Sequence, residues 1–331
     1  MNKVRLGTTD LDVSRLALGG LFVMSAHAEL EEARRAVARA VDLGVNYIDT
    51  APGYGNSEEV LGKALSGIDE PVVLSTKLGG RPEPFDAQDK DALRQSVEES
   101  LDLLGRDQID ILMIHEPDRP GQYDWWTDMV EVAGPVLELL DELKDEGLIR
   151  YTGLGGTTAY ELAHLIRSGK FDVVLTAFNY SLLWREAEHE IFPAARENGV
   201  GVIAGSPLQQ GALATPYDAI DNPDLYWLSK PRREQFRALY DLVEEVEMPL
   251  AEVALRFVLS SSDVDCVLMG AKSVEEVELN VASVERGPLE EDLLARLDEI
   301  AEMVPFRPFE EPFGIGWKLR YPEGYKGPGG A

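Results

Sequence analysis

Eight short apolar runs, spread along 331 residues and separated by helical or polar segments, constrain the fold of this chain most strongly. The runs are Arg15–Gly20, Val45–Asp49, Val72–Lys77, Ile109–His115, Tyr151–Gly155, Val173–Asn179, Val200–Pro207 and Val264–Ala271. Between them, apolar residues recur at helical spacing in Glu29–Leu43, Asp89–Leu104, Thr127–Glu146, Thr157–Ser168 and Arg185–Asn198. Such alternation predicts parallel strands joined by right-handed helical crossovers.

Eight units of this kind favour a closed (β/α)8 barrel of the TIM type, because an open nucleotide-binding sheet would carry a glycine-rich turn after its first strand. We expect one domain over residues 1–331, with a core at about 15–303. A hairpin at Val4–Leu6 and Leu11–Val13 precedes the core, and 212–248 is predicted to be a loop insertion plus a helix. The aromatic tail 304–331 is predicted to lie over the barrel mouth.

The charge balance restricts the partners. Acidic side chains outnumber basic ones by 60 to 31, for a net charge of −29, which disfavours nucleic acid and anionic membranes. The acidic residues are spread along the chain, as in a protein adapted to a high-salt cytoplasm. The alternative is an acidic enzyme of ordinary salt tolerance. The N-terminus lacks an apolar signal core and no stretch is long enough to span a bilayer, so we expect a cytoplasmic protein. The single cysteine, Cys266, allows no internal disulfide.

Four ionisable side chains are predicted to meet at one rim of the barrel. Asp49, Lys77 and His115 end the second, third and fourth runs, and Tyr54 lies in the loop just after Asp49. In such barrels the carboxyl ends of the strands carry the chemistry. Each residue taken alone has a structural alternative, such as a turn cap for Asp49 or a core histidine for His115. Their joint placement is harder to explain without a catalytic site.

These four groups suit proton transfer to a carbonyl oxygen. A tyrosine is a weak acid at neutral pH, and a nearby ammonium lowers its pKa. Lys77 would supply that ammonium, Asp49 would keep it charged, and His115 would orient the carbonyl. Since no side chain can deliver a hydride, a nicotinamide cofactor is implied. No metal site is predicted.

Three separated motifs resemble the aldo-keto reductase superfamily: GVNYIDTAPGYGNSEEVLGKAL, then STKLG, then LRQSVEESLDLLGRDQIDILMIHEPD. The resemblance runs from the hairpin to about Asn280. It implies an NADPH- or NADH-dependent (β/α)8 barrel whose catalytic tetrad is Asp49, Tyr54, Lys77 and His115. The expected reaction is reduction of an aldehyde or ketone, or oxidation of the matching alcohol or aldose, with Tyr54 as general acid and base.

The resemblance also implies the cofactor residues: Gly20, Gly155, Gly156, Ser206, Pro207, Leu208, Gln210, Gly211, Gly270, Lys272, Ser273, Glu276 and Asn280. Gly155 and Gly156 replace the family's usual Ser-Asn pair, and Thr157 or Thr158 is expected to compensate. Lys272 favours a 2′-phosphate, whereas Glu276 would repel one. On balance, the sequence favours NADPH or use of both cofactors.

Trp125, Trp126 and Trp184 are candidate substrate-binding residues, with ordinary packing as the alternative. The expected partner is a small carbonyl compound or sugar, and the oligomeric state is left open. Two other functions remain: a non-catalytic nicotinamide-binding regulatory subunit, and a Schiff-base aldolase that uses Lys77. The aldolase needs a lysine of lowered pKa, which Asp49 opposes.

Overall fold

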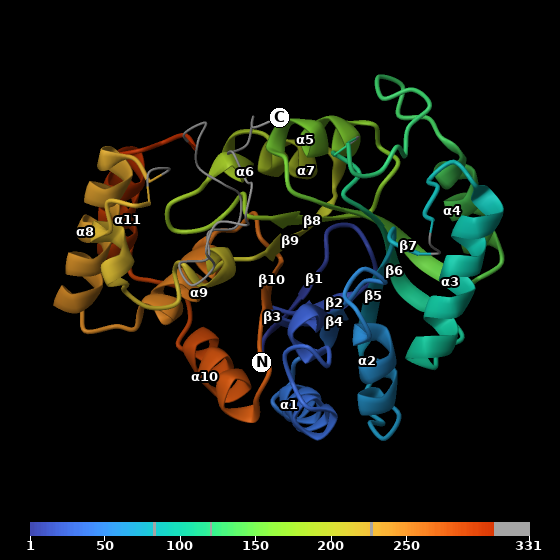
Figure 1. Ribbon diagram of the computed structural model, residues 1–331, viewed down its shortest axis with the longest axis horizontal. Coiled ribbons are helices and arrows are strands. Elements are labelled where there is room, and N and C mark those ends of the chain that lie inside the picture. Colours follow the sequence, from blue (N-terminus) through green and yellow to red (C-terminus); the bar gives the residue numbers. More distant parts are fainter. Residues whose placement is uncertain (82–83, 120, 226–227, 308–331) are drawn as a thin grey trace.

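The protein is described by a computed structural model that covers residues 1–81, 84–119, 121–225 and 228–307. Eight parallel strands close into a barrel in the order β10-β3-β4-β5-β6-β7-β8-β9 (Figure 1). They are β3 (Leu16–Gly19), β4 (Tyr47–Asp49), β5 (Val73–Leu78), β6 (Ile109–His115), β7 (Ile149–Gly156), β8 (Val173–Ala177), β9 (Gly201–Gly205) and β10 (Cys266–Met269). This confirms the predicted (β/α)8 barrel.

The predicted N-terminal hairpin is present as β1 (Lys3–Arg5) and β2 (Asp12–Ser14), paired antiparallel. It lies at the amino-terminal end of the barrel. The Thr8 amide donates to Gly199 O at 3.0 Å, just before β9 begins, and Asn46 Oδ1 accepts from the Ser14 amide at 2.6 Å, just before β4. The hairpin therefore covers the end of the barrel opposite the rim where the strands finish.

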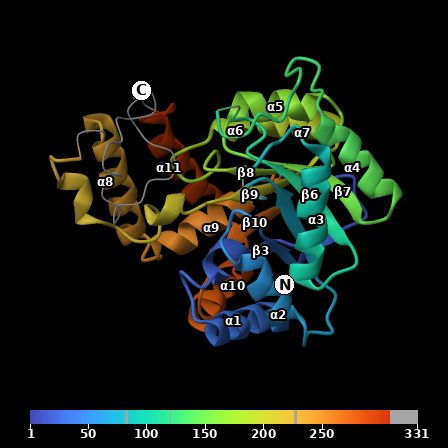
Figure 2. The same ribbon diagram turned by 45° about the vertical axis from the view of Figure 1, so that its right-hand side comes forward.

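Helices cover the outside of the barrel (Figures 1 and 2). The longer helices are α1 (Leu30–Asp42), α2 (Ser57–Leu65), α3 (Lys90–Leu104), α4 (Pro135–Asp145), α5 (Ala159–Arg167), α7 (Ile191–Asn198), α8 (Lys230–Glu245), α9 (Leu250–Ser260), α10 (Val274–Glu285) and α11 (Glu291–Glu302). The short ones are α6 (Glu186–His189), η1 (Gly20–Val23), η2 (Gln209–Gly211) and η3 (Asp218–Asp221). Helices α8 and α11 lie side by side at one edge, where Gln235 Nε2 donates to Ile300 O at 2.7 Å.

The core has two layers. The larger one packs the helices onto the outer face of the strands, and the smaller one fills the barrel with side chains such as Tyr47, Ile111, Met113 and Leu175. A filled interior is usual for this architecture, so the barrel is a packed support and the chemistry is confined to its rim. Cys266 belongs to the inner layer, and burial raises the pKa of its thiol, as expected for an inert cysteine.

Two predicted helices differ from the structure. The helix predicted from Thr127 begins only at Pro135, because Asp128 Oδ1 accepts from the backbone amides of Val130 and Glu131 and folds this segment into a turn. The helix predicted over Arg185–Asn198 is interrupted at Glu190 between α6 and α7. Pro193 lacks the amide hydrogen that a continuous helix would need there.

The segment 212–248 contains η3 and α8, as predicted. The predicted placement of the aromatic tail over the barrel mouth falls mainly on residues 308–331, which lie outside the described residues. Among the helices that the structure describes, none combines the length and the apolar character needed to cross a membrane.

Candidate active site

The four predicted catalytic residues lie together at the carboxyl ends of three adjacent strands. Asp49 is the last residue of β4, Lys77 the penultimate residue of β5 and His115 the last residue of β6. The strand register pairs Asp49 with Ser75 and Lys77 with Met113, so Lys77 and His115 each lie two residues beyond the position that pairs with the preceding catalytic residue. Tyr54 follows in the loop between β4 and α2, where its amide donates to Ala51 O at 3.0 Å.

A buried ion pair joins Asp49 and Lys77. The Lys77 ammonium donates to Asp49 Oδ2 at 2.6 Å and to Thr50 O at 2.7 Å, and both side chains are at most 3% exposed. Burial disfavours the ammonium, but Asp49 and the Tyr54 phenol outweigh burial and raise the pKa of Lys77. Lys77 therefore carries its charge at neutral pH.

Ser75 holds the second oxygen of the Asp49 carboxylate. Its hydroxyl donates to Asp49 Oδ1 at 2.7 Å and lies 2.8 Å from the Tyr47 hydroxyl deeper in the barrel. Sequence reasoning missed Ser75. The only signal for it was its place on the same face of β5 as Lys77, two residues earlier.

Tyr54 is placed against the lysine. The Lys77 ammonium lies 4.9 Å from the centroid of the Tyr54 ring. Burial is the largest influence and raises the pKa of Tyr54, whereas the Lys77 charge lowers it by less. The sequence-based expectation of a net lowering of the Tyr54 pKa is therefore not met. Tyr54 holds its proton at neutral pH, as a proton donor must.

His115 meets Tyr54 edge to face, with ring centroids 5.7 Å apart. Burial, with a smaller contribution from the Lys77 charge, lowers the pKa of His115 to about 3. The imidazole is therefore neutral at physiological pH. Its Nδ1 atom is buried and has no hydrogen-bond partner among the described residues. A neutral ring with an unused nitrogen beside a phenol is suited to orienting a polar substrate atom.

The three candidate tryptophans separate into two regions. Trp125 is fully buried beside the site, where its Nε1 donates to His115 O at 2.9 Å, and Trp126 Nε1 donates to Pro117 O at 2.7 Å. Trp184 is 1% exposed and lies in the core near α8. The Arg232 guanidinium carbon packs over it, 4.8 Å from the centroid of the Trp184 ring. Trp184 thus contacts the segment that carries α8, whereas Trp125 contacts His115.

Gly155 and Gly156 end β7 beside the tetrad. A Cβ atom at Gly155 would lie 3.2 Å from Lys77 Cε, and one at Gly156 would lie 2.4 Å from Asp118 Oδ1. Asp118 Oδ2 accepts from the Thr157 amide at 2.8 Å and from the Thr158 hydroxyl at 2.7 Å. The Thr158 hydroxyl is therefore used inside the protein.

Glu116, which sequence reasoning also missed, directly follows His115. Its Oε2 accepts from the Thr157 hydroxyl at 3.0 Å, so this hydroxyl too is used inside the protein. The Arg119 guanidinium lies 3.5 Å from the same carboxylate. Burial raises the pKa of Glu116, partly offset by Arg119.

The loop after β9 has an unusual backbone. Ser206, Gln209 and Gln210 have φ values of 53°, 48° and 55°, a conformation that L-residues other than glycine seldom adopt. Pro207 and Leu208 lie within this loop, and Gly211 ends η2 with φ 102°. Strain of this kind concentrates at ligand-binding sites. Gln209 is fully buried, and its Oε1 has no partner among the described residues.

The amino-terminal end of α10 gathers most of the remaining predicted residues. Ser273 caps the helix by accepting from the Glu276 amide at 3.2 Å, and Glu276 Oε2 accepts from the Lys272 amide at 3.0 Å. Asn280 follows one turn later and is half-buried. Gly270 precedes this turn, and a Cβ atom there would lie 2.5 Å from the Phe22 ring.

Gly20 directly follows β3, the strand that lies between β10 and β4 in the barrel. A Cβ atom at Gly20 would come within 2.8 Å of Asp49 O and Ser57 Oγ, so the backbone there leaves room only for glycine. Together, these features fit a nucleotide-type cofactor that lies across the rim. They are the glycines that leave no room for a side chain, the strained loop after β9, the amino-terminal end of α10, and the two buried polar atoms without a partner among the described residues. Among the described residues, no group of three or more His, Cys, Asp or Glu side chains is arranged to hold a metal ion.

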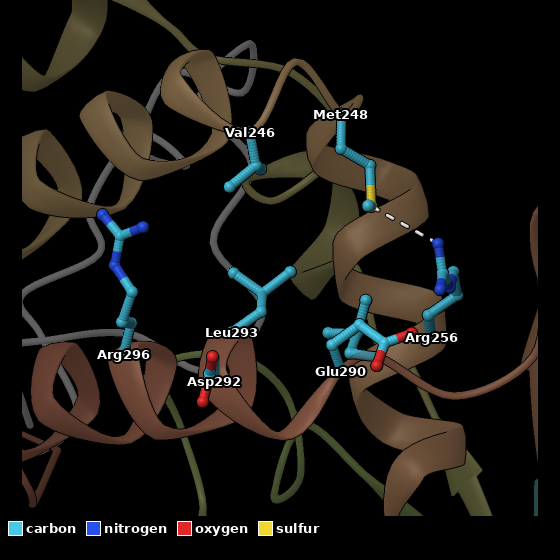
Figure 3. Close-up of a pocket in the computed structure, with 8 residues that line it drawn as sticks. Val246, Met248, Arg256, Glu290, Asp292, Leu293 and Arg296 are labelled. Atoms are coloured by element: carbon cyan, nitrogen blue, oxygen red, sulfur yellow. Dashed lines mark hydrogen bonds between the residues drawn. The ribbon is translucent and has the colours of Figure 1, made fainter.

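A cavity of about 280 Å³ between α8, α9 and α11 lies apart from this site (Figure 3). Its floor is apolar, and Arg256 and Arg296 stand at its edge. Arg256 Nη1 pairs with Glu252 at 3.0 Å, and Arg296 Nη2 pairs with Glu245 at 2.5 Å, so both charges are balanced within the protein. Glu290 and Asp292 also line this cavity, which contains none of the four predicted catalytic residues.

Comparison with known proteins gives a consistent result. Residues 15–302 match the model of the aldo/keto reductase family. The chain is 32% identical to an NADH-specific methylglyoxal reductase of Escherichia coli strain K12, over 86% of this chain and 94% of that protein. It is 29% identical to an L-galactose dehydrogenase of Arabidopsis thaliana, over 94% and 97%. An aldo-keto reductase from Bacillus halodurans in its holo form has a similar structure, with a TM-score of 0.75, 29% identity, and coverage of 92% and 97%.

Proposed function

Because the chain belongs to the aldo/keto reductase family, we propose that it reduces a small aldehyde or ketone, or oxidises the matching alcohol or aldose, with Tyr54 as the proton donor and acceptor. The observation that carries this proposal is the buried Asp49–Lys77 pair set against the protonated Tyr54 phenol. When bound, a nicotinamide cofactor supplies or accepts the hydride.

Four side chains carry out proton transfer, charge stabilisation and substrate orientation. The Tyr54 hydroxyl donates its proton to the carbonyl oxygen, and the Lys77 ammonium stabilises the phenolate that is left. Asp49 keeps that ammonium charged and fixed. Neutral His115 orients the carbonyl through a ring nitrogen. The end of β7 would hold the nicotinamide, the strained 206–211 loop the pyrophosphate, and the start of α10 the adenosine ribose.

We further propose that NADH is preferred over NADPH, in contrast to the balance that the sequence alone favoured. Glu276 folds back onto the Lys272 amide, which places its carboxylate at the α10 terminus. Glu32 Oε1 also lies 3.4 Å from the Val274 amide. Two carboxylates at these amides repel a 2′-phosphate and can accept hydrogen bonds from a ribose diol. The similarity to an NADH-specific methylglyoxal reductase supports the same preference.

For the substrate, we propose a small uncharged carbonyl compound or sugar, as the names of the two curated relatives suggest. Tyr123 and Trp125 lie against Gly79 and His115, so Trp125 and the adjacent Trp126 would shape the mouth from behind.

Replacing Tyr54 with Phe tests the function. We expect turnover to fall by about 10³-fold, because the proton donor is lost, while cofactor binding measured by tryptophan fluorescence quenching stays within twofold. Methylglyoxal and a panel of aldoses serve as substrates. Retained turnover in Y54F would exclude Tyr54 as the donor. Borohydride trapping of Lys77 with a carbonyl compound would instead support the aldolase, and cofactor binding without any turnover by the wild type would support a regulatory subunit.

A further inference from the structure

Glu58 is a buried carboxylate close to the tetrad that the proposed mechanism does not use. It lies in the first turn of α2, four residues after Tyr54, and is 2% exposed. Its Oε1 accepts from the Thr76 hydroxyl at 2.6 Å, and its Oε2 lies 2.9 Å from Nη1 of Arg81. Since a buried carboxylate is unfavourable unless it is paired, these two contacts define its role.

The contacts reach across three elements. Arg81 follows β5, and its Nη2 donates to Ser96 O at 3.1 Å and to Ser100 Oγ at 2.6 Å on α3. Glu58 therefore connects α2 to β5 directly through Thr76, and to α3 through Arg81. A carboxylate that only stabilised the amino-terminal end of α2 would not need these contacts, and Glu59 stands in the same turn for that purpose.

Thr76 directly precedes Lys77. Side chains alternate across a strand, so Thr76 meets α2 on the outer face of β5 while Lys77 meets Asp49 on the inner face. Tyr54 lies in the loop that ends at α2. Ser57, the first residue of α2, anchors the same end of that loop to the rim, because its hydroxyl donates to Gly20 O at 2.7 Å. Glu58 thus ties the loop that carries the phenol to the strand that carries the ammonium.

A cavity of about 390 Å³ borders this connection, and it is lined by Glu58 and Arg81 together with Pro52, Gly55 and Gly80 among others. Resting on the function proposed above, we propose that Glu58, with Thr76 and Arg81, is a positioning residue that sets the Tyr54 phenol against the Lys77 ammonium.

The chain offers matched variants for a test. T76V removes the hydroxyl that Glu58 accepts from, whereas T76S keeps it. E58Q removes the charge that Arg81 pairs with, whereas E99Q removes a second carboxylate, 49% exposed, whose Oε2 lies 3.3 Å from Arg81 Nε. We expect kcat to fall by about tenfold to a hundredfold in T76V and E58Q, with KM and NADH affinity within twofold. T76S and E99Q should stay within twofold of the wild type.

Hydrogen exchange in the ligand-free proteins provides a readout that does not depend on turnover. The peptide containing residues 50–58 should exchange faster in T76V and E58Q than in their partners T76S and E99Q. Three results would each overturn the positioning role. They are wild-type kcat and exchange rates in T76V, a loss of kcat in E99Q equal to that in E58Q, and an effect of T76V and E58Q that is confined to KM or NADH affinity. A wild type that reduces none of the carbonyl compounds would contradict the proposed function instead, and the exchange comparison would still decide whether Glu58 holds the loop.

Discussion

The Lys77 ammonium donates to Asp49 Oδ2 at 2.6 Å, and neither side chain is more than 3% exposed. The same carboxylate accepts from Ser75 through its other oxygen, so its position is fixed from two sides. An ammonium held in this way needs no rearrangement when negative charge develops on a neighbouring phenol. Preorganised charge of this kind is usually a large contributor to catalysis.

Replacing Asp49 with Asn removes the anion that keeps Lys77 charged. Without it, burial dominates and the pKa of Lys77 falls. We expect the free energy of unfolding to fall by about 3–5 kcal/mol, as when one partner of a buried pair is removed. We also expect kcat to fall by at least about 10²-fold. Urea unfolding and steady-state kinetics at pH 7 measure the two effects.

Ser75→Ala is the matched control for Asp49→Asn. It removes one hydrogen bond to the carboxylate and leaves the ion pair, so kcat should fall less than in D49N. D49N should also show more borohydride trapping of Lys77 with a carbonyl compound, because a neutral amine is the nucleophilic form. Equal kinetics in D49N and the wild type would contradict the assigned role of the pair.

His115 makes stability depend on pH. Its folded pKa is about 3, below the ordinary value near 6.5, so the unfolded chain binds a proton first as the pH falls. The contribution of neutral His115 to the free energy of unfolding is complete above about pH 6.5 and is lost progressively below it. Relative to the wild type, H115Q should therefore gain about 1.4 kcal/mol of unfolding free energy per pH unit below 6.5.

Urea unfolding between pH 5 and 7.5 tests this dependence. His164→Gln, at an exposed position of α5, is the matched control for loss of a histidine. A difference between H115Q and the wild type that stays constant over this range would show that His115 is not held neutral by burial.

Much of the site follows from the order of the apolar runs. Asp49, Lys77 and His115 each end a run, and parallel strands in a barrel bring their carboxyl ends together. The direction of the Tyr54 pKa could not be predicted, because it depends on how much solvent the folded loop excludes. Spacing predicts which residues meet, while desolvation is a property of the assembled structure.

Contacts between distant segments account for most of what the sequence did not predict. Glu58 resembles any acidic residue in the first turn of a helix until Thr76 and Arg81 are seen to meet it. Trp184 is an aromatic residue of the kind that can line a substrate pocket, yet Arg232 on α8 packs over its ring and helps to bury it. No local periodicity encodes either outcome.

Glu276→Gln should shift the cofactor preference. The amide oxygen can still accept from the Lys272 amide, but the charge that would face a 2′-phosphate is removed. We expect the ratio of the NADPH to the NADH dissociation constant to fall by about tenfold, equivalent to about 1.4 kcal/mol. Glu275→Gln, at an exposed position in the same helical turn, is the matched control. Titration by tryptophan fluorescence quenching measures the ratio, and an unchanged ratio in E276Q would remove Glu276 from the cofactor site.

Salt should stabilise the protein if the net charge of −29 reflects adaptation to high salt. Exposed ion pairs such as Arg94–Glu146 would weaken, but pairs of this kind contribute only about 0–1 kcal/mol each. Repulsion among 60 acidic side chains acts over longer distances, and molar salt shortens the screening length to about 3 Å. We therefore expect both Tm and activity to rise between 0.1 and 2 M KCl, measured by thermal unfolding and by initial rates. A Tm and an activity that stay level or fall would show that the acidic composition belongs to an enzyme of ordinary salt tolerance.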